Sequence, residues 1–468
     1  MSGVSSGTCL SRSIAEVAMQ LSPERVPPSV WAYLKLCVAD AIGIAMASRH
    51  HGFAGRTEVA LLRFAEAGSG VVIGSRRKLP IRDAALLNGV LIHGLDYDDT
   101  HLASVVHCSA SAVPVALALA SDGSLSGNDF LMAVLLAIEI DGRLGSAAGG
   151  LFQELGFHPT GLVGLFGAVV AAVRLMGGSV DDAIRAQGIA LSTASGSMAF
   201  LDDGSWTKRL HPGWAASSAL TAASLAVSGF EAPTEAYAGR YGFFSLYTRD
   251  ERNADKVQWD PSFNEWALDN VAIKPYPVCH FNHALIDAAL ALRGQAGVTV
   301  DAIQSGQILL HRQQFGVVAE PLDAKRRPRS EYDAKFSAPY AVATALVKGR
   351  FGLSELENEA REDPQVLDLA RRLSCRHDDR SLYPKVFSGG LTLTLNDGRE
   401  LEHFETVNRG AGERQLTTRE VKRKFEQNCA ASLSVAHVEA LWQAIIDLDN
   451  SDDCHELLQL LRSPLANV

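Results

Sequence analysis

The sequence lacks the patterns that identify several common classes of protein. It has no phosphate-binding GxxxxGK[ST] loop, and no GxGxxG segment follows a predicted strand and opens a helix, so nucleotide binding is not indicated. Its cysteines are scattered, odd in number and never spaced as CxxC, which offers no zinc-ribbon framework and favours reduced thiols. They are Cys9, Cys37, Cys108, Cys279, Cys375, Cys429 and Cys454.

Positive charge and long apolar runs are also scarce. Lys and Arg total 43 against 53 Asp and Glu, giving a net charge of −10, so nucleic acid is not expected as a partner. The most apolar stretch, 161–173, is closed by Arg174 and is too short to span a bilayer. The N-terminal residues show no basic segment followed by an apolar run. We therefore expect a cytoplasmic protein with no membrane partner.

The length and the apolar periodicity predict a mostly α protein of two domains. A chain of 468 residues with 47% hydrophobic residues is too long for one compact core. Residues 10–230 are rich in Ala, Leu and Val at helical spacing. The predicted helices are 29–49, 54–66, 81–95, 110–121, 127–147, 160–176, 179–194 and 213–228.

Local signals support these helices and indicate how they pack. Pro80 precedes one helix, and Ser179 with Asp182 forms a capping box at the start of another. The helix over 160–176 is apolar nearly all round, as in the interior of a bundle, and its Gly161, Gly164, Gly167, Ala168 and Ala171 permit close approach of neighbouring helices. Only 70–75 is strand-like in this half.

The pattern changes to α+β after about residue 265. Segments within 298–311 are predicted strands, and 388–406 alternates apolar and polar residues around Asp397-Gly398, a strong hairpin signal. Residues 336–349 and 353–373 are predicted helices, and the tail returns to helical periodicity. We therefore expect a large all-helical domain of residues 1–268 and 406–468, and a smaller α+β lid domain of residues 269–405. Because pockets favour domain interfaces, the site is expected between them.

One short segment, 88–114, concentrates ionisable side chains within an apolar, Ala-rich surrounding. Ionisable groups this dense are tolerated in a core only when they are paired or used in chemistry. The alternative is a capped helix end whose acids bind backbone amides. The polar residues concerned are His93, Asp96, Asp98, Asp99, Thr100, His101 and His107.

Further polar islands lie beside apolar helices. His158 lies in GFHPTG, and the segment SWTKRLHPGWAA carries Lys208 and Arg209 with His211 at a predicted helix start, where backbone amides favour anions. Lys274 in KPYP is a second candidate for binding a substrate carboxylate, and His280 and His283 follow it. Histidines suit proton transfer near neutral pH, and a desolvated lysine can act as a base. We expect these islands to converge at one pocket.

Two other interpretations of the first cluster are weaker. His93, Asp96 and His101 would supply metal ligands, but His93 and His101 are eight residues apart with no HExxH-like spacing. The string DYDDT matches a pattern of terpene cyclases, but aromatic residues make up only 7% of the chain. We therefore predict no metal and no organic cofactor.

Several of these blocks, in order along nearly the whole chain, resemble the MmgE/PrpD family, which includes 2-methylcitrate dehydratase, aconitate decarboxylases and iminodisuccinate epimerase. The blocks are NGVLIHGLDYDDTH, VHCSASAVPVALALA, GFHPTGLVGLFGAVVAA, KRLHPGWAASSALTAASLA, KPYPVCHFNHALIDAAL and AKFSAPYAVATAL. The resemblance implies a cofactor-free enzyme acting on small di- or tricarboxylates, with a helical domain, an α+β lid and a homodimeric assembly.

The resemblance also implies roles for individual residues. The family's active-site acid and threonine correspond to Asp96 and Thr100, and the histidine of the KxYP block corresponds best to His283. Its other histidines and its lysine correspond to His107, His158 and Lys208. The chain departs from the family pattern at Cys108, where proline is common, and at His280, which is an extra histidine. We assign catalysis to Lys208, His107, His158 and Asp96, and substrate binding to Thr100, Lys274, His283, Arg209 and His101.

The residues and the resemblance agree on one step, removal of a proton from a carbon next to a carboxylate. The sequence that accompanies the 2-methylcitrate dehydratase branch, NDTW, is absent, since this chain has Asp99-Thr100-His101. The sequence therefore favours epimerisation of an iminodisuccinate-like diacid. A 2-methylcitrate-type dehydratase and an aconitate-type decarboxylase are the alternatives within the family, and a carboxylate-binding protein is the non-enzymatic one.

Overall fold

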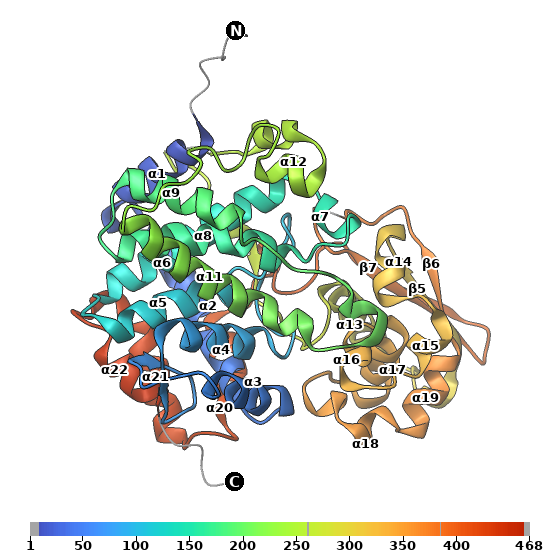
Figure 1. The fold of residues 1–468 in the computed structure, drawn as a ribbon. Coiled ribbons are helices and arrows are strands. Elements are labelled where there is room, and N and C mark those ends of the chain that lie inside the picture. The colour runs from blue at the N-terminus through green and yellow to red at the C-terminus, as the bar shows by residue number, and fades with distance from the viewer. Residues whose placement is uncertain (1–8, 260–261, 384, 463–468) are drawn as a thin grey trace.

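Two hydrophobic cores organise the chain in a computed structural model, which describes residues 9–259, 262–383 and 385–462 (Figure 1). The first core combines residues between Ile14 and Ile273 with residues of the tail between Leu416 and Leu461. The second combines residues between Tyr276 and Leu395. The tail helices therefore return to the N-terminal part of the molecule, where they pack beside α2 (Figure 1).

The first core is built from helices, most of which lie close to the predicted ranges, although the helix predicted over 213–228 begins at Thr207 and some of the short ones were not predicted. The capping box of Ser179 and Asp182 is present, which confirms the predicted start of α9. The helices are α1 (Leu10–Gln20), α2 (Pro28–Ser48), α3 (Gly52–Leu62), α4 (Ile81–His93), α5 (Ser109–Asp122), α6 (Gly127–Ala147), α7 (Leu151–Glu154), α8 (Pro159–Leu175), α9 (Val180–Leu191), α10 (Phe200–Asp203), α11 (Thr207–Val227), α12 (Phe243–Thr248), α20 (Thr418–Cys429), α21 (Val435–Ile446) and α22 (His455–Leu461).

Small residues bring the central helices close enough to fix the positions of the chain that follows them. A Cβ atom added to Gly89 of α4 would lie 2.5 Å from the Cα atom of Gly213 in α11. A Cβ atom added to Gly167 of α8 would lie 2.3 Å from the carbonyl oxygen of Ala137 in α6. No larger side chain fits at either crossing without moving a backbone. The contact between α4 and α11 holds the first turn of α11 over the loop that follows α4.

Helix α2 is long and apolar enough to cross a bilayer, by length and composition alone. Within its most apolar window 78% of the residues are buried inside the structure. Burial against the other helices accounts for this apolar character, as in the core helix of a bundle.

The second core is a four-stranded sheet with helices packed on it. Strand order is β6-β5-β7-β8, with β5 and β6 parallel and the other pairs antiparallel. The strands are β5 (Ile303–Leu310), β6 (Leu373–His377), β7 (Gly389–Leu395) and β8 (Glu400–Glu405). The helices are α13 (His283–Arg293), α14 (Phe315–Val318), α15 (Leu322–Arg326), α16 (Glu331–Lys335), α17 (Ala338–Lys348), α18 (Asn358–Arg361) and α19 (Pro364–Arg371). The predicted hairpin around Asp397-Gly398 is confirmed by the pairing of β7 with β8.

Three sequence predictions about local structure are wrong. Residues 298–302 are not a strand, because a 3₁₀ turn over Val300–Ala302 precedes β5. Residues 353–373 are not one helix, because Pro364 cannot continue a helix and instead starts α19 behind the cap of Asp363. The strand-like segment 70–75 does contain β1 (Gly70–Val71), but it is not alone in the helical part, since β1 pairs with β2 (Lys78–Leu79), and β3 (Thr100–His101) pairs with β4 (Val271–Ala272).

Candidate active site

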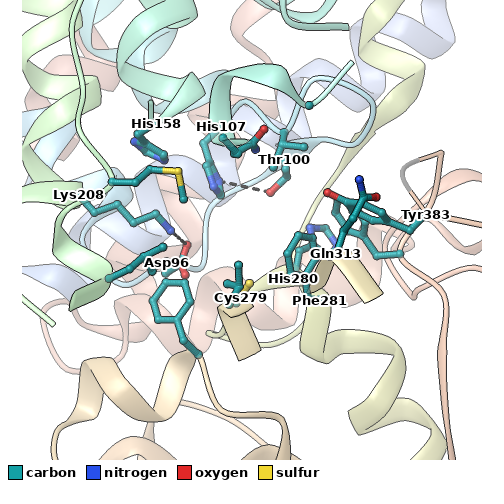
Figure 2. Close-up of a pocket in the computed structure, with 18 of the residues that line it drawn as sticks. Asp96, Thr100, His107, His158, Lys208, Cys279, His280, Phe281, Gln313 and Tyr383 are labelled. Carbon is teal, nitrogen blue, oxygen red and sulfur yellow. Dashed lines mark hydrogen bonds and ion pairs between the residues drawn. The ribbon is translucent and has the colours of Figure 1, made fainter. Parts of the chain in front are cut away.

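A cavity of about 450 Å³ is lined by residues from both parts of the chain, the helical part and the part that carries the four-stranded sheet (Figure 2). This volume lies within the range of small-molecule sites, about 300–1,000 Å³. The lining from the helical part is Asp96, Thr100, Val105, His107, Gly149, Gly150, Gln153, Glu154, His158, Met198, Phe200, Leu201 and Lys208. The rest is Lys274, Cys279, His280, Phe281, Gln313, Val317, Phe336, Tyr383 and Phe387.

Three helix starts meet at the cavity. His158 is the N-cap residue of α8, Lys208 is the second residue of α11, and His107 lies two residues before α5. Because the N-terminus of a helix carries unpaired amides and a partial positive charge, this arrangement favours an anionic ligand. The polar islands of the sequence thus converge as predicted.

Asp96 is the anionic centre of the site and is held by two ammonium groups. Its Oδ1 accepts from the Nζ of Lys208 at 2.8 Å and from the Nζ of Lys274 at 3.0 Å. Burial acts to raise the pKa of Asp96, but the charges of Lys208 and Lys274 outweigh it and hold the pKa well below its usual value. With one carboxylate against two lysines, this cluster keeps a net positive charge for a substrate carboxylate.

His107 is held as a neutral imidazole over the cavity. Its Nδ1 donates to the carbonyl oxygen of Asp99 at 2.8 Å, and the Thr100 hydroxyl lies 3.3 Å from the same nitrogen. Burial lowers the pKa of His107 to about 3. A neutral ring whose Nδ1–H is already donated presents its other nitrogen, Nε2, to the ligand as a hydrogen-bond acceptor.

His158 is the second imidazole on this side of the cavity. Its Nδ1 lies 3.0 Å from Nδ1 of His211, one of the two acting as donor. Burial, followed by the charge of His211, holds the pKa of His158 well below its usual value. Figure 2 shows the rings of His158 and His107 above the ion pair of Lys208 and Asp96. Two neutral imidazoles therefore face the Lys208–Asp96 ion pair across one small volume.

The opposite wall comes from the second core and was largely missed from the sequence. It is lined by Cys279, Phe281, Gln313 and Tyr383 (Figure 2). The first two lie in the KPYPVCHFNH block but were not singled out there, and the other two lie in segments with no distinguishing pattern. His280 also lines it, with Nε2 bonded to the amide of Asn408 at 2.7 Å. The extra histidine of that block is thus the one at the cavity.

Three of the residues assigned to substrate binding lie outside the cavity lining. His101 follows Thr100 in β3, so its side chain points to the other face, where Nδ1 contacts the Ser104 hydroxyl at 2.9 Å. Arg209 follows Lys208 in α11 and donates from Nε to the carbonyl oxygen of Gly94 at 2.7 Å. His283 begins α13 and contacts the carbonyl oxygen of Val278 at 3.2 Å through Nε2. Thr100 and Lys274, by contrast, do line the cavity.

Among the described residues two groups have the spacing of metal ligands. They are His93 with His107 and His158, and Asp96 with Asp98 and His107; within each group the candidate ligand atoms lie within 4.8 Å of one another. His93 donates through Nδ1 to the Asp98 carboxylate at 2.8 Å, and its Nε2 finds no hydrogen-bond partner among the residues that the structure describes. Three imidazoles are a donor set that suits zinc. The metal ligands considered from sequence, His93 with Asp96 and His101, do not form such a group.

Comparisons of the sequence with known proteins agree on one family. Residues 12–255 match the MmgE/PrpD N-terminal domain and residues 276–450 match the MmgE/PrpD C-terminal domain. The chain is 30% identical over 403 residues to the human cis-aconitate decarboxylase, covering 83% of this chain and 80% of that protein. It is 26% identical over 468 residues to the cis-aconitate decarboxylase-like protein oryM of Aspergillus oryzae, covering 95% and 96%.

A third relative, the cis-aconitate decarboxylase of Aspergillus terreus, is 25% identical over 487 residues, covering 100% of this chain and 97% of that protein. These relatives carry the name of a decarboxylase, whereas the sequence alone favoured an epimerase. The two domain matches together span most of the chain in the order predicted from the sequence blocks. The chain therefore belongs to the MmgE/PrpD family.

Proposed function

We propose that this protein is a cofactor-independent decarboxylase of a small unsaturated tricarboxylate of the cis-aconitate type. The observation that carries the proposal is the cavity in which Lys208 and Lys274 flank Asp96 beneath two neutral imidazoles. The names of the relatives support decarboxylation over the epimerisation that the sequence favoured. The shared chemistry is charge development on a carbon next to a carboxylate.

The reaction needs one proton and no redox change. In cis-aconitate the bond from the CH₂ carbon to its carboxylate breaks, and the released electron pair forms a new CH₂=C double bond. The electrons of the old double bond move onto the former vinylic carbon, where the adjacent carboxylate delocalises the charge. A proton then adds to that carbon, and CO₂ leaves. The transition state is therefore an enolate-like anion that cations stabilise.

The cavity residues divide this work between binding and proton transfer. Lys274 binds a carboxylate that stays, and Lys208 stabilises the enolate-like charge and delivers the proton. His107 is not the proton donor, because its low pKa leaves the ring neutral near pH 7 and its one N–H donates to the carbonyl oxygen of Asp99. Its Nε2 can therefore only accept a hydrogen bond. The apolar side chains of Phe200, Phe336 and Phe387 surround the site, and a less polar medium strengthens each of these interactions.

The proposal is tested by incubating the purified protein with cis-aconitate, with 2-methylcitrate-like hydroxy acids and with stereochemically pure diacids. Release of CO₂ from the unsaturated acid is the expected result. Water loss from a hydroxy acid would support the dehydratase instead, and inversion of a diacid without loss of mass would support the epimerase. Binding of these acids without turnover of any would leave a carboxylate-binding protein.

We predict that removing divalent metal ions leaves turnover unchanged. Lys208 and Lys274 supply the cationic and proton-transfer groups that this reaction requires, so no Lewis acid is needed. Turnover of cis-aconitate is measured before and after dialysis against EDTA, with dialysis against plain buffer as the control. If activity disappears with EDTA and returns with zinc, the ring nitrogens of His93, His107 and His158 are a catalytic metal site and this account of the chemistry is wrong.

A further inference from the structure

Four consecutive carbonyl groups around Asp96 each accept a hydrogen bond from a different buried cation. The segment concerned, residues 94–97, joins α4 to β3 and is called here the 94–97 loop. The bonds are Arg209 Nε to Gly94 at 2.7 Å, Lys335 Nζ to Leu95 at 2.7 Å, Lys274 Nζ to Asp96 at 2.8 Å and Lys424 Nζ to Tyr97 at 2.9 Å. Every carbonyl of the loop thus has a cationic donor.

The four cations come from parts of the chain that are far apart in sequence. Arg209 lies in α11, Lys274 between β4 and α13, Lys335 at the end of α16, and Lys424 in α20. All four are buried: the exposed fraction is 4% for Arg209, 1% for Lys274, 0% for Lys335 and 5% for Lys424. Lys335 comes from the block AKFSAPYAVATAL, which also supplies Phe336 of the cavity lining, and Lys424 comes from the tail segment TTREVKRKFEQNCAASL.

The 94–97 loop needs this support because of the conformation at its centre. Asp96 has a φ of +53°, in the left-handed region that few residues with a side chain adopt, Asp and Asn more often than the others. Such a conformation persists only when surrounding contacts fix it, and it is concentrated at functional sites. The same residue carries the carboxylate that lies between Lys208 and Lys274. Fixing the loop backbone therefore fixes that carboxylate.

Stability alone is a poor explanation for these lysines. Lysine is seldom fully buried without a charged partner, because desolvating the ammonium is unfavourable. Lys335 and Lys424 do have acidic partners, Glu331 at 2.9 Å and Asp40 at 2.7 Å, but each also reaches past that partner to a loop carbonyl. An apolar side chain at either position would avoid the free-energy cost of desolvating an ammonium group. Only the lysine, however, can donate a hydrogen bond to the loop carbonyl.

We propose that Arg209, Lys335 and Lys424 are positioning residues that hold the 94–97 loop so that the Asp96 carboxylate bridges Lys208 and Lys274. None of the three lines the cavity, so they act through Asp96 rather than on the substrate. This inference rests on the proposed function for its kinetic consequences, but its structural content does not depend on which acid is the substrate.

Lys335 is the most informative of the three because it links the two cores. It ends α16, whose Ala334 belongs to the second core, and it reaches a carbonyl of the helical part. Separation of the cores would break the Lys335–Leu95 bond. The catalytic geometry of Asp96 is thereby tied to the closed arrangement of the two parts.

The test compares Lys335→Met, Lys335→Gln and Lys335→Arg with the wild type. The first removes both charge and donor, the second keeps a shorter neutral donor, and the third keeps both. Lys35→Met is the matched control, because Lys35 is a mostly buried lysine of α2 that pairs with Asp449 at 2.8 Å away from the loop. We measure kcat and KM for cis-aconitate, and the crystal structure of Lys335→Met.

For Lys335→Met we expect kcat to fall about 10- to 100-fold with a smaller change in KM, since small misplacements of catalytic groups have effects of this size. Lys335→Arg should recover most of the loss and Lys335→Gln less, while Lys35→Met keeps wild-type kcat. In the crystal, Asp96 should leave the left-handed conformation. A kcat within twofold of wild type, or a reduced kcat with Asp96 unmoved, overturns the proposal.

Two further arms keep the result decisive. If Lys335→Met does not fold, Lys424→Met replaces it with the same expectations. If the wild type releases no CO₂ from cis-aconitate, the proposed function fails, and the crystal structures then decide this inference alone. An Asp96 that keeps its position in the variant would refute it in that case.

Discussion

The Lys208→Ala variant is expected to lose about 10³-fold or more in turnover of cis-aconitate. Lys208 is the group proposed to stabilise the enolate-like charge and to deliver the proton, and losses of this size follow removal of such groups. Lys208 lines the cavity, and the residue is only 6% exposed. The measurement is kcat from the rate of CO₂ release.

The same variant should keep its fold, because Asp96 retains Lys274 as a buried partner. Its melting temperature is the control, and we expect it to lie close to that of the wild type. Lys208→Arg, which keeps the positive charge but transfers protons poorly, should restore binding more than turnover. A Lys208→Ala enzyme within tenfold of wild-type kcat would show that the proton comes from elsewhere.

Asp96→Asn is expected to have the second largest effect, on both turnover and stability. The neutral amide leaves the buried ammonium groups of Lys208 and Lys274 without their shared anion. Breaking a buried ion pair from one side destabilises a protein by about 3–5 kcal/mol. Turnover should fall about 10²- to 10³-fold, because the two lysines repel each other and leave the positions that they hold around the substrate.

Urea unfolding and kcat measured on the same Asp96→Asn preparation separate the two effects. The matched control is Asp129→Asn, which removes an exposed carboxylate at the start of α6 and should leave kcat unchanged. If Asp96→Asn has wild-type stability and turnover, then Asp96 does not organise the two lysines and the site must be assigned differently.

Regular secondary structure was the most predictable part of the fold. The apolar periodicity and the capping signals placed most of the long helices of the first core within a few residues, because each such signal acts over one or two turns. The start of α11 was placed at 213 instead of Thr207. β6 was missed, since its residues LSCRH lack an alternating pattern and their strand conformation depends on parallel pairing with β5. Pairing between segments more than 60 residues apart leaves no local signal.

Within the site, sequence reasoning identified the segments better than the individual side chains. Neighbouring residues point in different directions, so Thr100 lines the cavity while His101 turns toward α6, where Gly142 lies against its ring. Lys208 and Arg209 diverge in the same way on α11. The choice of His283 over His280 failed to select the cavity residue because the chain turns between them, through a 3₁₀ turn, before α13 begins.

The cations that hold the 94–97 loop could not be predicted as a group from the sequence. Lys335 and Lys424 lie in helical segments with no pattern that marks them as buried, and a lysine in such a segment is normally predicted to lie on the surface. Their convergence depends on how the second core and the tail pack against the helical part. This is long-range information that composition and periodicity do not contain.

The most direct test of the proposed reaction is to incubate the enzyme with cis-aconitate in D₂O and to follow the product by NMR. The account predicts loss of CO₂ with one deuterium on the saturated carbon next to a carboxylate, and none in the new CH₂=C group. Deuterium exchange or inversion at a diacid carbon without loss of mass, together with no CO₂ from cis-aconitate, would contradict it.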